Sequence, residues 1–327
     1  MERLDGRLAV VTGGGTGMGR ELARQLTAAG ASVAICDVSA DNMAETRALA
    51  ESEAAGSGFA SGPRISTFVA DVADEAQLVA FRDHVTATHA ADHLHLLFNN
   101  AGIGGGGSFV LDDRSEWEKV YGVCWGGVYL GTRTFLPLLL AADEGHVVNT
   151  SSVNGFWASL GPGTAHTAYS AAKFAVKGFT EALITDFRLY APHLRASVVM
   201  PGHIGTSIAF NSGEYLSRNP KELTAEQLGE IRDRMGRQGV DLSAVGDEDL
   251  RTAIVQRAEA FRDAAPTTAA QAATIILDGV RANRWRILVG DDAQVLDELV
   301  RSDPEAAYEP SFMERIRNRG AFGFIGR

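Results

Sequence analysis

The sequence predicts an α/β protein with a doubly wound, Rossmann-type parallel sheet, in three layers with helices on both faces. Three observations predict it. A strand, a glycine-dense turn and a helix follow one another in residues 8–30, apolar segments then alternate with amphipathic ones, and polar residues follow several predicted strands. We expect one catalytic domain over residues 1–327, with a core at about 4–206 and 266–291, a helical lid at about 207–265 and a helical tail at about 292–327.

The first unit has the form of an anion-binding turn. Leu8–Val11 is a short apolar run suited to a central parallel strand, and leucines and alanines then recur at helical spacing up to Gly30. Between these segments stand Gly13, Gly14, Gly15, Gly17 and Gly19, which permit sharp turns and close approach to the backbone. A helix N-terminus behind such a turn favours a dinucleotide pyrophosphate, although the glycines alone fit a flexible loop equally well.

Further strands and helices alternate along the chain. The predicted strands are Ser32–Asp37, Ile65–Ala70, Leu94–Phe98, Gly145–Ser152 and Arg195–Met200, with a break at Met200–Pro201. The predicted helices are Ala40–Ala55, Ala73–Ala90, Arg114–Leu140 as one long helix, and Ala168–Tyr190, with a loop at Gly56–Pro63. Because parallel strands end at one edge of the sheet, we expect that edge to collect Gly13–Gly19, Asp37, Asp71-Val72 and Asn99–Gly102.

Asp37 indicates which dinucleotide binds. It lies 18 residues after Gly19, close to where such folds place a carboxylate on the adenosine ribose. Its alternative role is a helix cap, because the residues that follow favour a helix start. A carboxylate there repels a 2′-phosphate, and no Arg or Lys lies within Gly13–Met18 or immediately after Asp37. We therefore expect NAD rather than NADP, with Arg20 solvated or facing the pyrophosphate.

Composition limits the other function classes. The chain of 327 residues has a formal net charge of −11, which argues against nucleic acid as a partner. The N-terminal residues lack the apolar stretch of a signal peptide, and the apolar passage Phe135–Ala142 is too short to span a membrane. Cys36 and Cys124 have no metal-binding spacing and form no disulfide framework, so we expect a cytoplasmic protein without a metal.

Tyr169 and Lys173 are candidates for acid–base chemistry. They lie four residues apart on one predicted helix and therefore share a face, and Ser152 ends the preceding strand. Lowering the pKa of a phenol from about 10 by about three units requires roughly 4 kcal/mol. A cation at about 4 Å supplies about 1 kcal/mol in water and about 4 kcal/mol at an effective dielectric constant of 20. The pair can thus act as a base in a partly dry cleft, and is otherwise an ordinary surface pair.

Together these motifs resemble those of the short-chain dehydrogenases/reductases. The matching residues, in order, are Thr12-Gly13 with Gly17 and Gly19, Asn99-Asn100-Ala101-Gly102, Tyr169 with Lys173, and Pro201-Gly202. The resemblance is dense over about Leu4 to Thr206 and resumes near Pro266–Asp291. It implies an enzyme that exchanges a hydride between nicotinamide and a secondary alcohol or ketone, and a homodimer or homotetramer formed through the two long helices.

The resemblance also assigns roles by position. Tyr169 would be the general acid in reduction and the base in oxidation, Lys173 would lower the pKa of that tyrosine and bind the nicotinamide ribose, and Ser152 would orient the substrate oxygen, with Ser151 a weaker candidate. The residues expected to contact NAD are Gly13, Gly15, Thr16, Gly17, Met18, Gly19, Asp37, Val38, Asp71, Val72, Asn100, Ala101, Gly102, Tyr169, Lys173, Pro201, Gly202, Ile204 and Thr206.

The chain departs from the family pattern in two places. Sixteen residues separate Ser152 from Tyr169, where the family usually has about a dozen, so we expect an insertion in the loop Val153–Ala168. Cys124 stands where the family usually has an Asn that holds a water for proton relay. A thiol is a weak hydrogen-bonding group, so we interpret Cys124 as a small buried residue. The departure keeps open a second function, a dinucleotide-binding regulator or scaffold with weakened catalysis.

The remaining regions carry less information. Ser207–Ala265 reads as charged amphipathic helices that form either a substrate lid or partner-facing cap, or a solvated surface. Four aromatic residues could form a partly apolar substrate wall or pack the loops: Phe156, Trp157, Phe210 and Tyr215. We expect His166 and His203 to be neutral lining residues, and the tail Asp291–Arg327 to form an oligomer contact or a neighbour-site contact.

Overall fold

The computed structural model describes residues 1–55, 64–161 and 164–321, so the predicted loop Gly56–Pro63 lies outside the described residues. Seven parallel strands form the central sheet in the order β3-β2-β1-β4-β5-β6-β9. Their bounds are β1 Leu8–Thr12, β2 Ser32–Asp37, β3 Ile65–Val69, β4 Leu96–Asn99, β5 Gly145–Thr150, β6 Leu194–Pro201 and β9 Arg286–Val289. The predicted doubly wound parallel sheet is confirmed.

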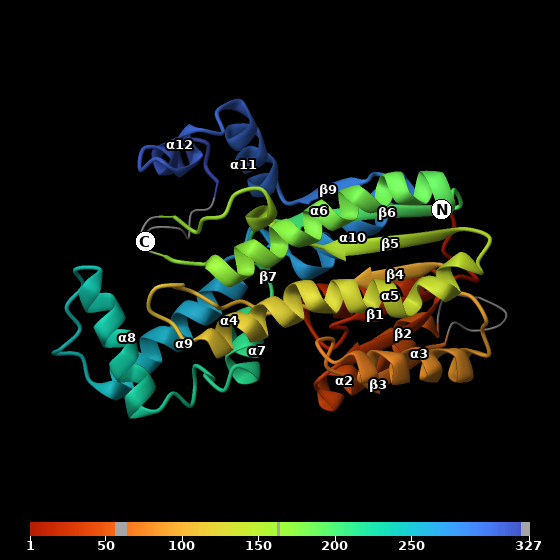
Figure 1. The fold of residues 1–327 in the computed structure, drawn as a ribbon. Coiled ribbons are helices and arrows are strands. Elements are labelled where there is room, and N and C mark those ends of the chain that lie inside the picture. Colours follow the sequence, from red (N-terminus) through yellow and green to blue (C-terminus); the bar gives the residue numbers. More distant parts are fainter. Residues whose placement is uncertain (56–63, 162–163, 322–327) are drawn as a thin grey trace.

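Helices cover both faces of this sheet (Figure 1). On one face lie α3 Glu75–His89, α5 Gly127–Leu140 and α6 Thr167–Tyr190, and on the other lie α1 Gly17–Ala28, α2 Ala40–Ala54 and α10 Ala269–Arg281. Successive side chains of a strand point to opposite faces of the sheet, so the two faces carry two apolar cores. Val10 packs in the first core, with α3, α5 and α6, whereas Ala9 and Val11 pack in the second core, with α1, α2 and α10. The strand order reverses between β1 and β4, and a crevice for a ligand forms at such a point.

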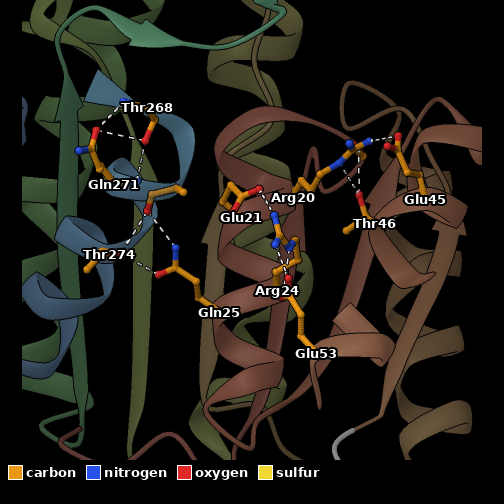
Figure 2. A network of polar contacts seen from close by, with 12 residues as sticks. Arg20, Glu21, Arg24, Gln25, Glu45, Thr46, Glu53, Thr268, Gln271 and Thr274 are labelled. Carbon is orange, nitrogen blue, oxygen red and sulfur yellow. Dashed lines mark hydrogen bonds and ion pairs between the residues drawn. The ribbon is translucent and has the colours of Figure 1, made fainter. Parts of the chain in front are cut away.

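Polar contacts hold α1 between its two neighbours (Figure 2). Arg24 pairs with Glu53 of α2, and Gln25 exchanges hydrogen bonds with α10 through Thr274 and the carbonyl of Ala270. Arg20 donates to the carbonyl of Gly15 at 2.7 Å and pairs with Glu45 at 2.7 Å. The expectation that Arg20 is solvated or faces the pyrophosphate is therefore wrong, because its guanidinium braces the glycine turn against α2.

The predicted long helix Arg114–Leu140 contains a change of winding. It runs as α4 Arg114–Tyr121, a π-helical segment Gly122–Gly126, and α5. By length and apolar composition this helix could cross a membrane, but half of its most apolar window is buried inside the fold. It is a core helix whose winding places Cys124, fully buried, toward the first core.

Two groups of helices lie beyond the sheet near the carboxyl ends of the strands (Figure 1). The predicted lid at 207–265 contains α7 Ile208–Tyr215, α8 Ala225–Arg237 and α9 Asp247–Asp263, and the short paired strands β7 Ile204–Gly205 and β8 Thr267–Thr268 flank it. It has a small apolar cluster of its own around Leu223, Leu228 and Leu250. The tail contains α11 Asp291–Ser302 and α12 Phe312–Asn318. Pro201 is paired with Val289 as the last residue of β6, so the strand ends there and not before it.

Candidate active site

A cleft of about 160 Å³ opens at the switch point of the sheet. The predicted cofactor residues that line it are Gly13, Thr16, Gly17, Met18, Asp37, Val38, Asp71, Val72, Asn100, Ala101, Gly102 and Thr206. They come from the ends of four different strands and from the segment after β7, as expected for parallel strands that end at one edge. The glycine turn and the later strand ends thus form one site.

The glycine turn is built so that no side chain could replace its hydrogens. Gly13 and Gly17 have φ values of +65° and +53°, which L side chains rarely adopt. A Cβ on Gly13 would lie 2.8 Å from the Cα of Ala101, and one on Gly19 would overlap the carbonyl oxygen of Gly13. The side chain of Thr12 accepts hydrogen bonds from the backbone N–H of Asn100 and of Ala101, each at 3.0 Å. The turn and the end of β4 therefore form a rigid, bare-backbone cradle that fits a dinucleotide.

Asp37 lies at the outer end of this cradle. Its Oδ2 accepts a hydrogen bond from the N–H of Gly15 at 3.0 Å, and its Oδ1 accepts one from the N–H of Ser39 at 3.1 Å. Ser39, rather than Asp37, caps α2. The nearby Arg20 turns its charge toward Glu45. The cradle thus presents a carboxylate at the position where a dinucleotide fold holds the adenosine ribose.

The three predicted catalytic residues are not among the lining residues of the cleft in the described part of the chain, but Lys173 lies beside Gly102, which lines it. Lys173 is buried, and its Nζ donates to the carbonyl of Thr150 at 2.8 Å. That Nζ lies 5.3 Å from the centroid of the Tyr169 ring, and a Cβ added to Gly102 would meet it at 3.4 Å. Ser151 is turned away from the cleft, because its hydroxyl donates to the carbonyl of Lys173. Ser152 therefore remains the serine that can face a substrate.

Burial shifts the pKa values of both Tyr169 and Lys173. It raises the pKa of Tyr169 above its usual value, whereas a hydrogen bond with Ser152 opposes that rise. Burial also lowers the pKa of Lys173. The expectation that Lys173 lowers the pKa of Tyr169 below its usual value is therefore not met by the protein groups alone. The sum of these effects keeps the phenol protonated, as a general acid requires.

Cys124 contacts the same region from the π-helical segment. Its Sγ donates to the carbonyl of Ile103 at 3.2 Å. A Cβ on Gly102 would lie 3.8 Å from this Sγ, so the thiol lies beside the same glycine as the Lys173 ammonium group. Cys124 is small and fully buried, as predicted, and in addition it ties the helix to the segment after β4.

Helix α7 closes over the cleft with residues that sequence reasoning did not assign to it. Tyr215 donates to Oδ2 of Asp71 at 2.7 Å, and Asn211 donates to Oγ1 of Thr16 at 2.8 Å. Burial and this bond to Asp71 raise the pKa of Tyr215, which stays neutral. The lining residues missed from the sequence are Ala70, Ile103, Val123, Ile208 and Asn211, whereas Tyr215 was expected only as part of an aromatic substrate wall. Ile208, Asn211 and Tyr215 recur at helical spacing after Pro201-Gly202, a signal that could have found them.

Several predicted contacts with the cofactor lie elsewhere. Ile204 is buried in the second core, and Pro201 is paired in the sheet. Gly202 faces Asp292, whose carboxylate a Cβ would strike. Gly15 and Gly19 act within the turn, the first through its bond to Asp37 and the second by close packing. None of these five is among the lining residues of the cleft in the described part of the chain, and neither are Tyr169 and Lys173.

The two histidines near the site are neutral. Burial lowers the pKa of His166 to about 4, and its ring lies 4.7 Å from that of Tyr169. Burial also lowers the pKa of His203, whose Nε2 is bonded to the carbonyl of Phe261 at 2.7 Å. Of the predicted aromatic wall, Trp157 packs against the tail and Tyr215 lines the cleft at Asp71.

Comparison with known proteins identifies the family. The model of the short chain dehydrogenases matches residues 7–215. The chain belongs to the short-chain dehydrogenase/reductase family. It is 32% identical over 302 residues to SadH of Mycobacterium tuberculosis, named as an oxidoreductase, covering 92% of each chain. It is 36% identical over 227 residues to levodione reductase of Leifsonia aquatica, covering 68% of this chain and 79% of that one.

Solved structures of the family agree with the fold. A short-chain dehydrogenase/reductase of Burkholderia phymatum in complex with NAD has a TM-score of 0.73 and 28% identity, covering 95% of this chain and 98% of that one. A metagenomic short-chain oxidoreductase in complex with NADP has a TM-score of 0.50 and 28% identity, covering 61% and 83%. The protein is thus an oxidoreductase of a family whose members bind NAD or NADP.

Proposed function

We propose that this protein is an NAD-dependent dehydrogenase/reductase that interconverts a secondary alcohol and a ketone. The observation that carries the proposal is the convergence of Tyr169, Ser152 and Lys173 beside a bare-backbone cradle that ends in Asp37. Similarity to levodione reductase supports a ketone as the substrate class. When bound, oxidised NAD supplies the hydride acceptor and a positively charged nicotinamide ring.

The residues of the chain would divide the remaining work. Tyr169 delivers a proton to the substrate oxygen in reduction and removes it in oxidation. Ser152 holds that oxygen through its hydroxyl. Lys173 keeps a positive charge near the phenol, which favours the phenolate when the tyrosine must act as a base. The position of the Lys173 Nζ next to Gly102 supports a proton donor that acts beside the cradle.

We further propose NAD over NADP. The carboxylate of Asp37 would accept hydrogen bonds from an unmodified ribose and repel a 2′-phosphate. Arg20, the nearest cation, pairs with Glu45 and so offers little attraction to a phosphate. The Burkholderia phymatum structure in complex with NAD supports the same choice.

The proposed organisation is one catalytic unit over residues 1–327, with 207–265 as its lid, in a cytoplasmic homodimer or homotetramer. The exposed outer face of the α5 and α6 helices supports such an assembly. Tyr129 and Phe174 are 47% and 42% exposed there, and Trp125 packs between the helices against Phe179. Sedimentation of the purified chain at several concentrations tests this arrangement.

The variant Tyr169→Phe tests the mechanism. It removes the proton donor and leaves the ring, so we expect turnover of ketones with reduced NAD to fall by at least about 1,000-fold while NAD still binds. The matched control is Tyr190→Phe, at a tyrosine that is 80% exposed at the end of α6. Rates equal to the parent in Tyr169→Phe would refute the assignment. Tight NAD binding by a parent without any turnover would favour the regulator.

A further inference from the structure

We infer that the C-terminal tail, with helices α11 and α12 and the residues between them, acts within its own chain to position two loops beside the candidate site. One loop follows Ser152 and spans residues 153–161, and the other is the segment 201–206, which begins at the last residue of β6 and ends at Thr206. The inference rests on the proposed function, because it assigns positioning residues to the same site. Its starting point is an apolar cluster in which loop and tail side chains pack together, separate from the two cores of the sheet.

The first loop is attached to the tail at consecutive residues. The indole Nε1 of Trp157 donates to the carbonyl of Ala307 at 2.7 Å, and the side chain is only 2% exposed. The N–H of Ala158 donates to the hydroxyl of Tyr308 at 3.0 Å. The ring of Phe312 lies 5.8 Å from that of Trp157. The tail thus fixes this stretch of loop by one packed indole and two hydrogen bonds.

The attachment continues inward to Ser152. Asn154 is buried, and its Nδ2 donates to the carbonyl of Trp157 at 3.0 Å and to that of Ser159 at 2.9 Å. The N–H of the same Asn154 donates to Oγ of Ser152 at 3.1 Å. A short 3-10 helix at Val153–Gly155 begins the loop, and the Asn154 side chain connects this turn to the residues attached to the tail. A shift of the tail would therefore reach the Ser152 hydroxyl through two residues.

The second loop is attached through a buried carboxylate. Asp292, in the first turn of α11, accepts a hydrogen bond from the N–H of His203 at 2.7 Å and one from the N–H of Ala293 at 2.9 Å. Gly202 leaves room for this carboxylate, which a Cβ would strike. The His203 ring in turn contacts the carbonyl of Phe261 at the end of α9. His203, which follows β6, therefore contacts the tail through Asp292 and the lid through Phe261.

The apolar faces of α11 and α12 pack mainly against each other, and the loop after Ser152 completes their cluster. Loop residues Val153 and Trp157 lie in the same cluster as Leu296, Phe312 and Ile316 of the tail. The tail of this chain is therefore a direct neighbour of the loop after Ser152, while the oligomer or neighbour-site contact expected from the sequence stays a prediction.

Two conservative variants in the full-length chain test this inference, each with a matched control. Tyr308→Phe removes the acceptor for the Ala158 N–H, and Tyr190→Phe is its control. Asp292→Asn removes the charge that receives the His203 N–H, and its control is Asp291→Asn, an exposed neighbour in the same turn. Hydrogen–deuterium exchange of peptides from residues 152–161 and 201–206 is measured together with NAD affinity and the kinetics of ketone reduction.

We expect exchange at 152–161 to be about fivefold faster in Tyr308→Phe, the factor for one hydrogen bond of about 1 kcal/mol. Exchange at 201–206 should be faster in Asp292→Asn. In both variants kcat should fall about tenfold or more, because misplacing the loops weakens orientation of the substrate. The Kd for NAD should stay within about twofold in Tyr308→Phe, because no residue of 153–161 is among the lining residues of the cleft, and should rise in Asp292→Asn, because Thr206 lines it.

Unchanged exchange in both loops would overturn the inference, and so would faster exchange with unchanged kcat. The controls should match the parent in every measurement. A parent protein that is inactive on all ketones would contradict the proposed function. Hydrogen–deuterium exchange does not depend on turnover, so in that case the exchange data alone would decide whether the tail holds the two loops.

Discussion

Replacing Lys173 by methionine tests how the site controls the phenol of Tyr169. The Nζ of Lys173 lies 5.3 Å from the ring centroid of Tyr169. At that distance and an effective dielectric constant of about 20, a unit charge stabilises the phenolate by about 3 kcal/mol. This energy corresponds to about two pKa units. Lys173→Met should therefore raise the pH midpoint of alcohol oxidation by about two units and lower the rate below that midpoint by about 100-fold.

The assay is the initial rate of alcohol oxidation at saturating NAD, from about pH 6 to about pH 11. Lys177→Met is the matched control, because Lys177 lies one turn further along α6 and pairs with Glu181 at 2.9 Å. Its midpoint should equal that of the parent. A Lys173→Met profile with the same midpoint and a uniformly lower rate would refute the electrostatic role and leave only a role in holding NAD.

Three further outcomes follow from single residues. Burial lowers the pKa of His146 to about 3, so stability from its neutral form is complete above about pH 6.5 and is lost as the pH falls toward 3. Denaturant unfolding should lose about 2 kcal/mol between pH 7 and pH 5 through this residue, and His146→Gln should not show that part of the loss. Asp37→Ser should lower the ratio of kcat/KM for NAD to that for NADP by about tenfold or more, because the carboxylate no longer repels a 2′-phosphate; an unchanged ratio would contradict the assigned preference. Cys124→Asn should keep or raise kcat, since an amide can also donate to the carbonyl of Ile103; a collapse of kcat would show a specific role for the thiol.

The sheet and the cradle could be predicted because their signals are local. Each strand is an apolar run of four to eight residues, and each ends in glycine or polar residues that a parallel sheet brings to one edge. Asp37, Asp71 and Asn100 are far apart in the chain, yet they line one cleft because β2, β3 and β4 are parallel. Periodicity and topology together were sufficient for this part of the site.

Tertiary contacts determined what could not be predicted. Arg20 looked available for a phosphate, but its partners Thr46 and Glu45 belong to another helix. The π-helical segment at Cys124 leaves the apolar pattern of a long helix intact, so only the glycines at both of its ends marked it. The bonds from α7 to Thr16 and Asp71 join residues 195 and 144 positions apart, and no spacing rule reaches that far.

The surroundings of the proposed catalytic pair, Tyr169 and Lys173, could not be predicted from the sequence either, and these surroundings determine the pKa of the phenol. Four-residue spacing placed Tyr169 and Lys173 on one face of α6 but left their surroundings open. Burial raises the pKa of the phenol, which disfavours the base, yet the same loss of water makes a nearby charge several times more effective. A Tyr–Lys pair on a wet surface would have neither effect. In the proposed role as acid and base, the pair would depend on a partly dry cleft, where the Ser152 hydrogen bond opposes the effect of burial and a nearby Lys173 charge would add to it.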